Sequence, residues 1–147
     1  MGRHGLELLE PLFQACLAAV TIFSGGQQDE AIEQGENALR VLLESEAKTY
    51  AVSVAAGIGM IYGSLVGQIP EADQKAQEHL DRAIELGGEI GAKGTMGQAY
   101  LDLGLLYKTK GEKERARECI SAAVSLFEEY ELENRLRQAK EALESLG

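Results

Sequence analysis

Two glycine-rich segments are the first candidates for chemistry, because such loops can cradle phosphate groups. The segment Gly57-Ile58-Gly59-Met60-Ile61-Tyr62-Gly63 looks faintly like a dinucleotide-binding loop, but its last spacing is wrong and no predicted strand precedes it. The segment Gly91-Ala92-Lys93-Gly94-Thr95 has neither the order nor the glycine spacing of a phosphate loop. We interpret the first as small residues for helix packing and the second as a helix joint, and we expect no cofactor.

Histidine, cysteine and carboxylate residues are the other candidates for chemistry. His4 and His79 lie more than one helical turn from any cysteine and from each other, and Glu78 does not share the helical face of His79. Cys16 and Cys119 are too few and too far apart for a disulfide framework or a zinc site, and free cysteines are commonly buried. No pair of carboxylates is marked out for acid–base work. The sequence therefore predicts no metal site and no enzyme.

Composition and charge restrict the class of protein. The chain has 147 residues, of which 45% are hydrophobic, enough for one domain with a continuous core. Its net charge of -10 repels phosphate backbones and anionic lipids, so we expect neither nucleic acid nor membrane as a partner. The longest nearly apolar run, 12–23, is shorter than the roughly 20 residues of a membrane-spanning helix. The first residues show no signal-peptide pattern, and we expect a cytoplasmic protein.

Helices must position any functional side chain, because helix-forming residues dominate between short breaks. No segment alternates as a strand does. Pro70 suits the first turn of a helix, with Glu71 and Asp73 near its positive end. About seven helices are expected, with breaks at Ser24–Gly26, Ser45–Lys48, Gly67–Pro70, Gly91–Gly94, Thr109–Gly111 and Tyr130–Glu133.

An internal repeat joins these helices in pairs. Its clearest copy reads Tyr100-x-x-Leu103-Gly104-x-x-Tyr107, followed by Ala116-x-x-x-Ile120-x-x-Ala123. A second copy reads Ile58-Gly59-x-x-Tyr62, followed by Ala76-x-x-x-Leu80-x-x-Ala83. A degenerate first copy has Ala18-Ala19-x-x-Ile22, then Ala31-x-x-x-Gly35-x-x-Ala38. The pattern resembles the tetratricopeptide repeat, with Tyr100 in place of its usual Trp and Ile120 in place of Phe.

The spacing of the copies supports the repeat more strongly than residue matching does. Successive copies are 40 and 45 residues apart, and a five-residue loop insertion in the middle copy explains the difference. Both intervals exceed the ~34 residues of the commonest form, so longer helices are expected. Because Gly59 and Gly104 recur in one register, we predict that two helices approach closely at each of them.

The resemblance implies the architecture of the whole chain. We expect one all-α domain over 1–147, a right-handed superhelix with repeats at about 12–45, 52–90 and 97–130 and a capping helix at about 131–146. The first helix of each pair would line a concave face that binds peptides or protein segments. Repeat positions that hold the structure would be Gly59, Tyr62, Ala76, Ala83, Tyr100, Leu103, Gly104, Tyr107, Ala116 and Ala123.

The same resemblance gives a mainly apolar candidate binding surface. Chaperone-binding members of the family hold a C-terminal carboxylate with Lys, Asn and Arg, but the matching positions here include Cys16, Val20, Gln98 and Asp102. That ligand class is therefore disfavoured. The expected concave face carries Phe13, Cys16, Val20, Phe23, Ser53, Ala56, Met60, Ser64, Gln98, Leu101, Leu105 and Lys108.

The two ends of the chain differ. The last helix has a single apolar stripe, as a capping helix should, whereas apolar residues surround the segment from Leu6 to Phe23 on nearly all sides. Either an upstream repeat is missing, or this segment docks on a second copy and forms a homodimer. The tail from Ile90 to Gly147 also resembles the C-terminal repeat regions of large bacterial adenylate cyclase and ATPase-linked regulators. Two hypotheses lead: a peptide-binding scaffold that forms the regulatory end of a longer protein, and a self-assembly module. A small helical enzyme is the third hypothesis and is less favoured than the other two.

Overall fold

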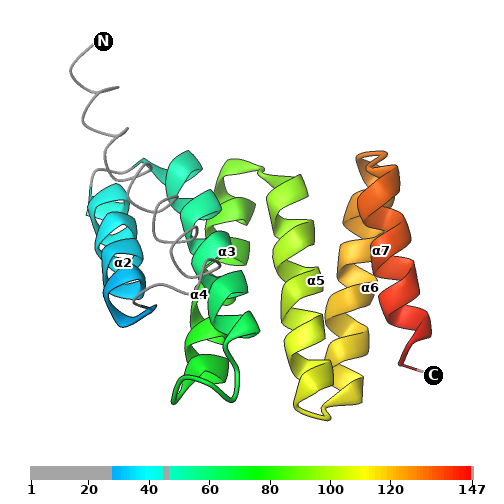
Figure 1. Ribbon diagram of the computed structural model, residues 1–147. Helices are drawn as coiled ribbons and strands as arrows, with labels where there is room; N and C mark the ends of the chain where they lie inside the picture. Colours follow the sequence, from blue (N-terminus) through cyan, green and yellow to red (C-terminus); the bar gives the residue numbers. More distant parts are fainter. Residues whose placement is uncertain (1–27, 45–46, 147) are drawn as a thin grey trace.

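The computed structural model describes residues 28–44 and 47–146, and helices dominate this part of the chain (Figure 1). No residue within these ranges belongs to an extended strand, and an isolated bridge pairs Val66 with Ile69. The all-helical prediction is confirmed for these residues. The helices are α2 (Gln28–Glu44), α3 (Lys48–Ser64), α4 (Ala72–Ile90), α5 (Lys93–Thr109), α6 (Lys113–Glu129) and α7 (Glu133–Glu144).

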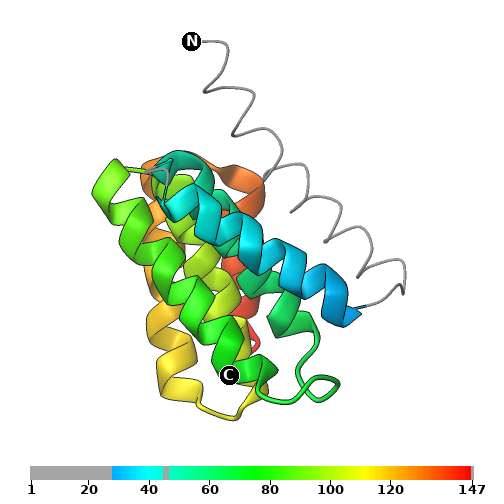
Figure 2. The same ribbon diagram turned by 90° about the vertical axis from the view of Figure 1, so that its left-hand side faces the viewer.

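The helices stack in chain order, and each packs against the next (Figure 1). Helix α5 also packs against both α3 and α7, so these three helices form one layer. Helices α2, α4 and α6 form the other layer, and their backbones do not come within packing distance of one another. Figure 2 shows α2 and α4 on the same side of the stack. The α3/α5/α7 layer is therefore the more closely spaced of the two.

One type of turn closes four of the joints. In each, a backbone N–H donates to the carbonyl oxygen five residues earlier, which satisfies a carbonyl at the end of the preceding helix. The four bonds are Ala47 to Leu42 at 3.0 Å, and Ala92 to Gly87, Glu112 to Tyr107 and Leu132 to Phe127 at 2.9 Å.

Three of these joints contain a residue in the left-handed region. Gly91 and Gly111 adopt φ of 74° and 81°, which glycine tolerates without steric cost. At the joint before α7 the residue is Glu131, with φ of 53°, and its Cβ strains this turn. These joints have the same length, and α5 and α6 have the same number of residues. Helices α5, α6 and α7 therefore begin twenty residues apart.

The joint between α3 and α4 is the exception. It spans residues 65–71, whereas residues 110–112 join α5 to α6, so most of the expected insertion falls here. The remaining residue lies in the first turns of α4, because Ala76 is the fifth residue of α4 whereas Ala116 is the fourth residue of α6. Pro70 was expected in the first turn of a helix, but α4 begins at Ala72. Glu71, with φ of 63°, interrupts the helical path between them.

Close helix contacts occur where glycine recurs in the sequence. A Cβ built on Gly104 would lie 2.5 Å from Cγ1 of Ile120, and one on Gly59 would lie 2.6 Å from Cγ of Leu80. The close approaches predicted at these two glycines are present. A third glycine, Gly97, faces the ring of Phe127 in the same way.

The other expected repeat positions lie in or beside this core. Tyr100 is half-buried and packs against the core. The buried members are Tyr62, Ala76, Ala83, Leu103, Tyr107, Ala116 and Ala123.

Candidate functional site

The expected concave face divides into four groups. Phe13, Cys16, Val20 and Phe23, like the dimer segment from Leu6 to Phe23, lie outside the described residues. Of the rest, the exposed side chains are Ser53, Met60, Ser64, Leu105 and Lys108. Ala56 and Gln98 are half-buried.

The fourth group is Leu101 alone. The sequence predicts it on the concave surface, and this prediction is wrong. Its side chain is 4% exposed and belongs to the hydrophobic core. Helix α5 packs against α3, α4, α6 and α7, so little of its circumference is left free. The accessible stripe runs instead through Asp102, Leu105 and Thr109.

A hollow of about 210 Å³ lies at this stripe, between α3, α4 and α5. Two exposed apolar side chains line it, Met60 on α3 with 44% exposure and Leu105 on α5 with 39%. Leu80 of α4 contributes from the second layer. Gly63 also lines the hollow, and a Cβ built there would meet no atom within 4 Å. The remaining lining residues are Gly59, Asp102, Leu106 and Thr109.

Asp102 is the acidic residue of this lining. Nε2 of Gln98 donates a hydrogen bond to Oδ1 of Asp102 at 3.2 Å. Burial raises the pKa of the Asp102 carboxyl, and the hydrogen bond from Gln98 opposes this shift. No lysine, arginine or histidine of the described ranges forms an ion pair with it. The hollow therefore combines apolar walls with a carboxylate that has no cationic partner among those residues.

Lys108 does not supply that partner. Its Nζ donates to Oγ of Ser145 at 2.8 Å, so its ammonium group is directed toward the end of α7. The hydroxyl of Thr109 donates to the carbonyl oxygen of Leu105 at 3.0 Å, which leaves its lone pairs free to accept.

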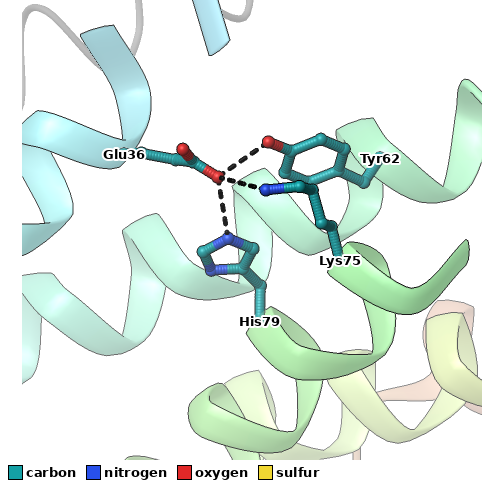
Figure 3. Close-up of polar contacts among 4 residues, drawn as sticks. All are labelled: Glu36, Tyr62, Lys75 and His79. Carbon is teal, nitrogen blue, oxygen red and sulfur yellow. Dashed lines mark hydrogen bonds and ion pairs between the residues drawn. The ribbon is translucent and has the colours of Figure 1, made fainter. Parts of the chain in front are cut away.

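A second polar group joins α2 to the α3–α4 pair (Figure 3). Oε1 of Glu36 accepts a hydrogen bond from the hydroxyl of Tyr62 at 2.7 Å and lies 3.5 Å from Nε2 of His79. Nζ of Lys75 is 3.9 Å from the same oxygen and 5.9 Å from the centre of the Tyr62 ring. The rings of Tyr62 and His79 are stacked, with centroids 5.7 Å apart. We name these four residues the α2 junction.

The next pair of helices has a corresponding group. Tyr107 occupies the position of Tyr62 one repeat later, and the guanidinium of Arg115 lies over its ring at 5.6 Å, as Lys75 lies over Tyr62. Asp81 and Cys119 occupy the positions of Glu36 and His79, and the charge of Asp81 raises the pKa values of both Tyr107 and Cys119, although burial contributes more. An acidic residue, a tyrosine and a basic residue (Lys75 or Arg115) thus recur where one helix pair meets the next. This recurrence favours a structural role for the α2 junction and for the group around Tyr107.

The α2 junction places a titratable ring in an enclosed position. Burial lowers the pKa of His79, against the opposing effect of Glu36. Nδ1 of His79 is enclosed and meets no hydrogen-bond partner in the described ranges. Burial and the Glu36 carboxylate raise the pKa of Tyr62, so its hydroxyl stays protonated and continues to donate.

The free energy of unfolding is expected to fall as the pH drops below 6.5, in part through His79. The unfolded chain takes up a proton at the ordinary histidine pKa of 6.5, whereas the folded chain does so only at lower pH, so the neutral ring stabilises the fold above 6.5 and that contribution is lost below it. His79→Gln retains an amide donor for Glu36 without a titrating ring.

Urea denaturation of the wild type and of His79→Gln at pH values around 6.5 isolates the contribution of His79 to the pH dependence of stability. The other titratable groups around it, Glu36, Lys75, Glu78 and Arg82, are the same in both proteins. The wild type should lose more stability than His79→Gln as the pH falls. Parallel pH profiles for the two chains would exclude a contribution from His79.

Sequence reasoning missed the α2 junction and the role of Gly63. A signal for the junction was available, because Tyr107 follows Tyr62 by 45 residues and Arg115 follows Lys75 by 40, the same two intervals as the repeat. Extending those intervals to polar positions would have paired Glu36 with Asp81. No comparable signal marks Gly63, because free space beside a glycine depends on how three helices meet.

Comparison with known proteins gives no family: the chain matches no protein-family model and no curated protein. Within the described ranges, no cluster of histidine, cysteine or acidic residues is arranged to hold a metal ion. No helix in that part of the chain is long and apolar enough to cross a membrane.

Proposed function

We propose that this chain is a non-catalytic scaffold of the tetratricopeptide type that binds a peptide segment of another protein on its α3/α5 face. The observation that carries the proposal is the hollow between α3, α4 and α5, flanked by the exposed side chains of Met60 and Leu105. Flexible side chains such as methionine suit grooves that accept peptides.

The helix arrangement supports the tetratricopeptide part of the proposal. Helices α3, α5 and α7 pack side by side, whereas the helices of the other layer stand further apart. A stack with this difference in spacing would curve toward its closer layer, which supports the α3/α5 face as the concave one in this proposal. The recurring junctions around Tyr62 and Tyr107 add a second repeated feature.

The size of the hollow favours a side chain over a metabolite. Pockets for small molecules commonly measure roughly 300–1,000 Å³. The volume here is about 210 Å³, enough to seat one long side chain of a peptide that lies across the face. Binding would be completed by contacts of neighbouring peptide residues with Met60 and Leu105.

Gly63→Leu is expected to block this site without unfolding the chain. A Cβ at this position meets open space, and Gly63 lies in the last turn of α3, where replacement of glycine by leucine should not destabilise the helix. Its side chain would occupy the hollow and weaken peptide binding by about tenfold or more. The probes are peptides that the wild-type chain selects from a random display library, with affinities measured by fluorescence anisotropy.

Gly57→Leu is the matched control. Gly57 lies in the same helix, a Cβ there also meets no atom within 4 Å, and it does not line the hollow. Both variants should remain helical and at least as stable as the wild type, and only Gly63→Leu should lose affinity. Equal affinity of the two variants would place the site elsewhere, and failure of the wild type to select any peptide would refute the proposed function.

Cytoplasmic location, the absence of nucleic acid and membrane partners, and an origin as the regulatory end of a longer protein are further parts of this proposal. They rest on the composition, on the net charge of -10 and on the resemblance of the tail. Homodimer formation through Leu6 to Phe23 stays a prediction, since that segment lies outside the described residues.

A further inference from the structure

The chemistry of the hollow indicates which side chain it would accept. Its walls come from Met60, Leu80, Leu105 and Leu106, which contact methylene groups well. The lining also includes Asp102 and Thr109, whose carboxylate and hydroxyl oxygens can accept hydrogen bonds. A long aliphatic stem with a cationic end matches this combination, because the stem fills apolar space while the charge meets the acceptors.

The charge distribution favours the same ligand. Asp102 forms no ion pair with a basic residue of the described ranges, and Lys108 is held by Ser145. The net charge of -10 also attracts basic segments over longer distances. An acidic peptide would instead place like charges together in a partly buried site.

We propose that Asp102 binds the cationic end of a lysine or arginine side chain from the partner peptide, with apolar peptide residues beside it on Met60 and Leu105. This inference rests on the proposed function and specifies the partner: a segment in which a basic residue lies next to apolar ones. Burial disfavours the ionised carboxylate of Asp102 on its own, and a bound cation would compensate for that cost.

A double-mutant cycle tests the contact. A lysine-containing peptide selected by the wild-type chain is synthesised with lysine and with norleucine, which keeps the aliphatic stem and lacks the ammonium group. Each peptide is titrated against the wild type and against Asp102→Asn. Loss of one charge-assisted hydrogen bond should weaken the lysine peptide by about tenfold or more on Asp102→Asn, while the norleucine peptide binds both chains alike.

Glu129→Gln controls for the overall charge. It removes the same single negative charge from an exposed position in α6, away from the hollow, and should leave the affinity of the lysine peptide nearly unchanged. Comparison of the lysine and norleucine peptides on the wild-type chain tests the same contact without a substitution in the protein. This result does not depend on how Asp102→Asn folds.

The outcomes separate this inference from the proposed function. Enrichment of lysine or arginine by the wild type, with coupling between the peptide charge and Asp102, supports both. Peptides that bind at the hollow without a basic residue, or a lysine effect that Asp102→Asn leaves intact, overturn the inference while the scaffold function stands. A wild type that selects no peptide overturns both.

Discussion

Replacement of Phe127 by alanine is expected to lower the free energy of unfolding by about 3–5 kcal/mol. The side chain is 0% exposed and is among the largest fully buried side chains of the described residues. Its ring fills the space left by Gly97, where an added Cβ would lie 2.6 Å from Cε1 of Phe127. Because α5 and α6 meet at this contact, truncation removes apolar contacts and leaves a cavity. Urea denaturation followed by circular dichroism measures the loss.

Tyr130→Ala is the control for Phe127→Ala. Tyr130 is another aromatic residue close in sequence, but its side chain is 48% exposed. Its truncation should change the free energy of unfolding by no more than about 0.5 kcal/mol. Similar losses for the two variants would mean that Phe127 is not part of a tightly packed core.

Gly104→Leu is expected to destabilise the chain by about 1–3 kcal/mol through overpacking. A Cβ at this position would lie 2.5 Å from Cγ1 of Ile120 and 3.2 Å from the backbone oxygen of Ala116. Ile120 is fully buried and β-branched, so its Cγ1 has little freedom to move, and the second neighbour belongs to the backbone of α6. The clash is therefore relieved only if the helices separate. Thermal unfolding should show a lower midpoint.

Gly57→Leu again provides the comparison, since it makes the same change in a helix at a position where an added Cβ meets no atom within 4 Å. A second test adds Ile120→Ala to Gly104→Leu, which removes the closest clashing side chain and should restore part of the loss. An unchanged midpoint for Gly104→Leu alone would show that the two helices are not held at this distance.

The helices and their joints could be predicted from the sequence because local chemistry determines them. Glycine at positions 91 and 111 ends helices in a left-handed conformation, and both joints were placed correctly. The close approaches at Gly59 and Gly104 were also predictable, because a glycine that recurs in one register of a repeat indicates a packing constraint.

The candidate site was less predictable because it depends on which face of a helix remains free. Helix α5 is apolar on most of its circumference and is contacted by four helices, so residue type alone did not distinguish buried Leu101 from exposed Leu105. Asp102 lines the hollow, and sequence reasoning used it only as an argument against carboxylate ligands. Its burial and the space beside Gly63 follow from the meeting of three helices.

The order of helix contacts also has a consequence for how the chain folds. In the described ranges, each helix packs only against helices one or two places away along the chain. Contacts of this kind have low contact order, and each requires closure of a short loop, so the entropy lost before the first contacts form is small. Stability is then approximately a sum over neighbouring helices, and the chain can open at α7 while the contacts between α2 and α3 persist.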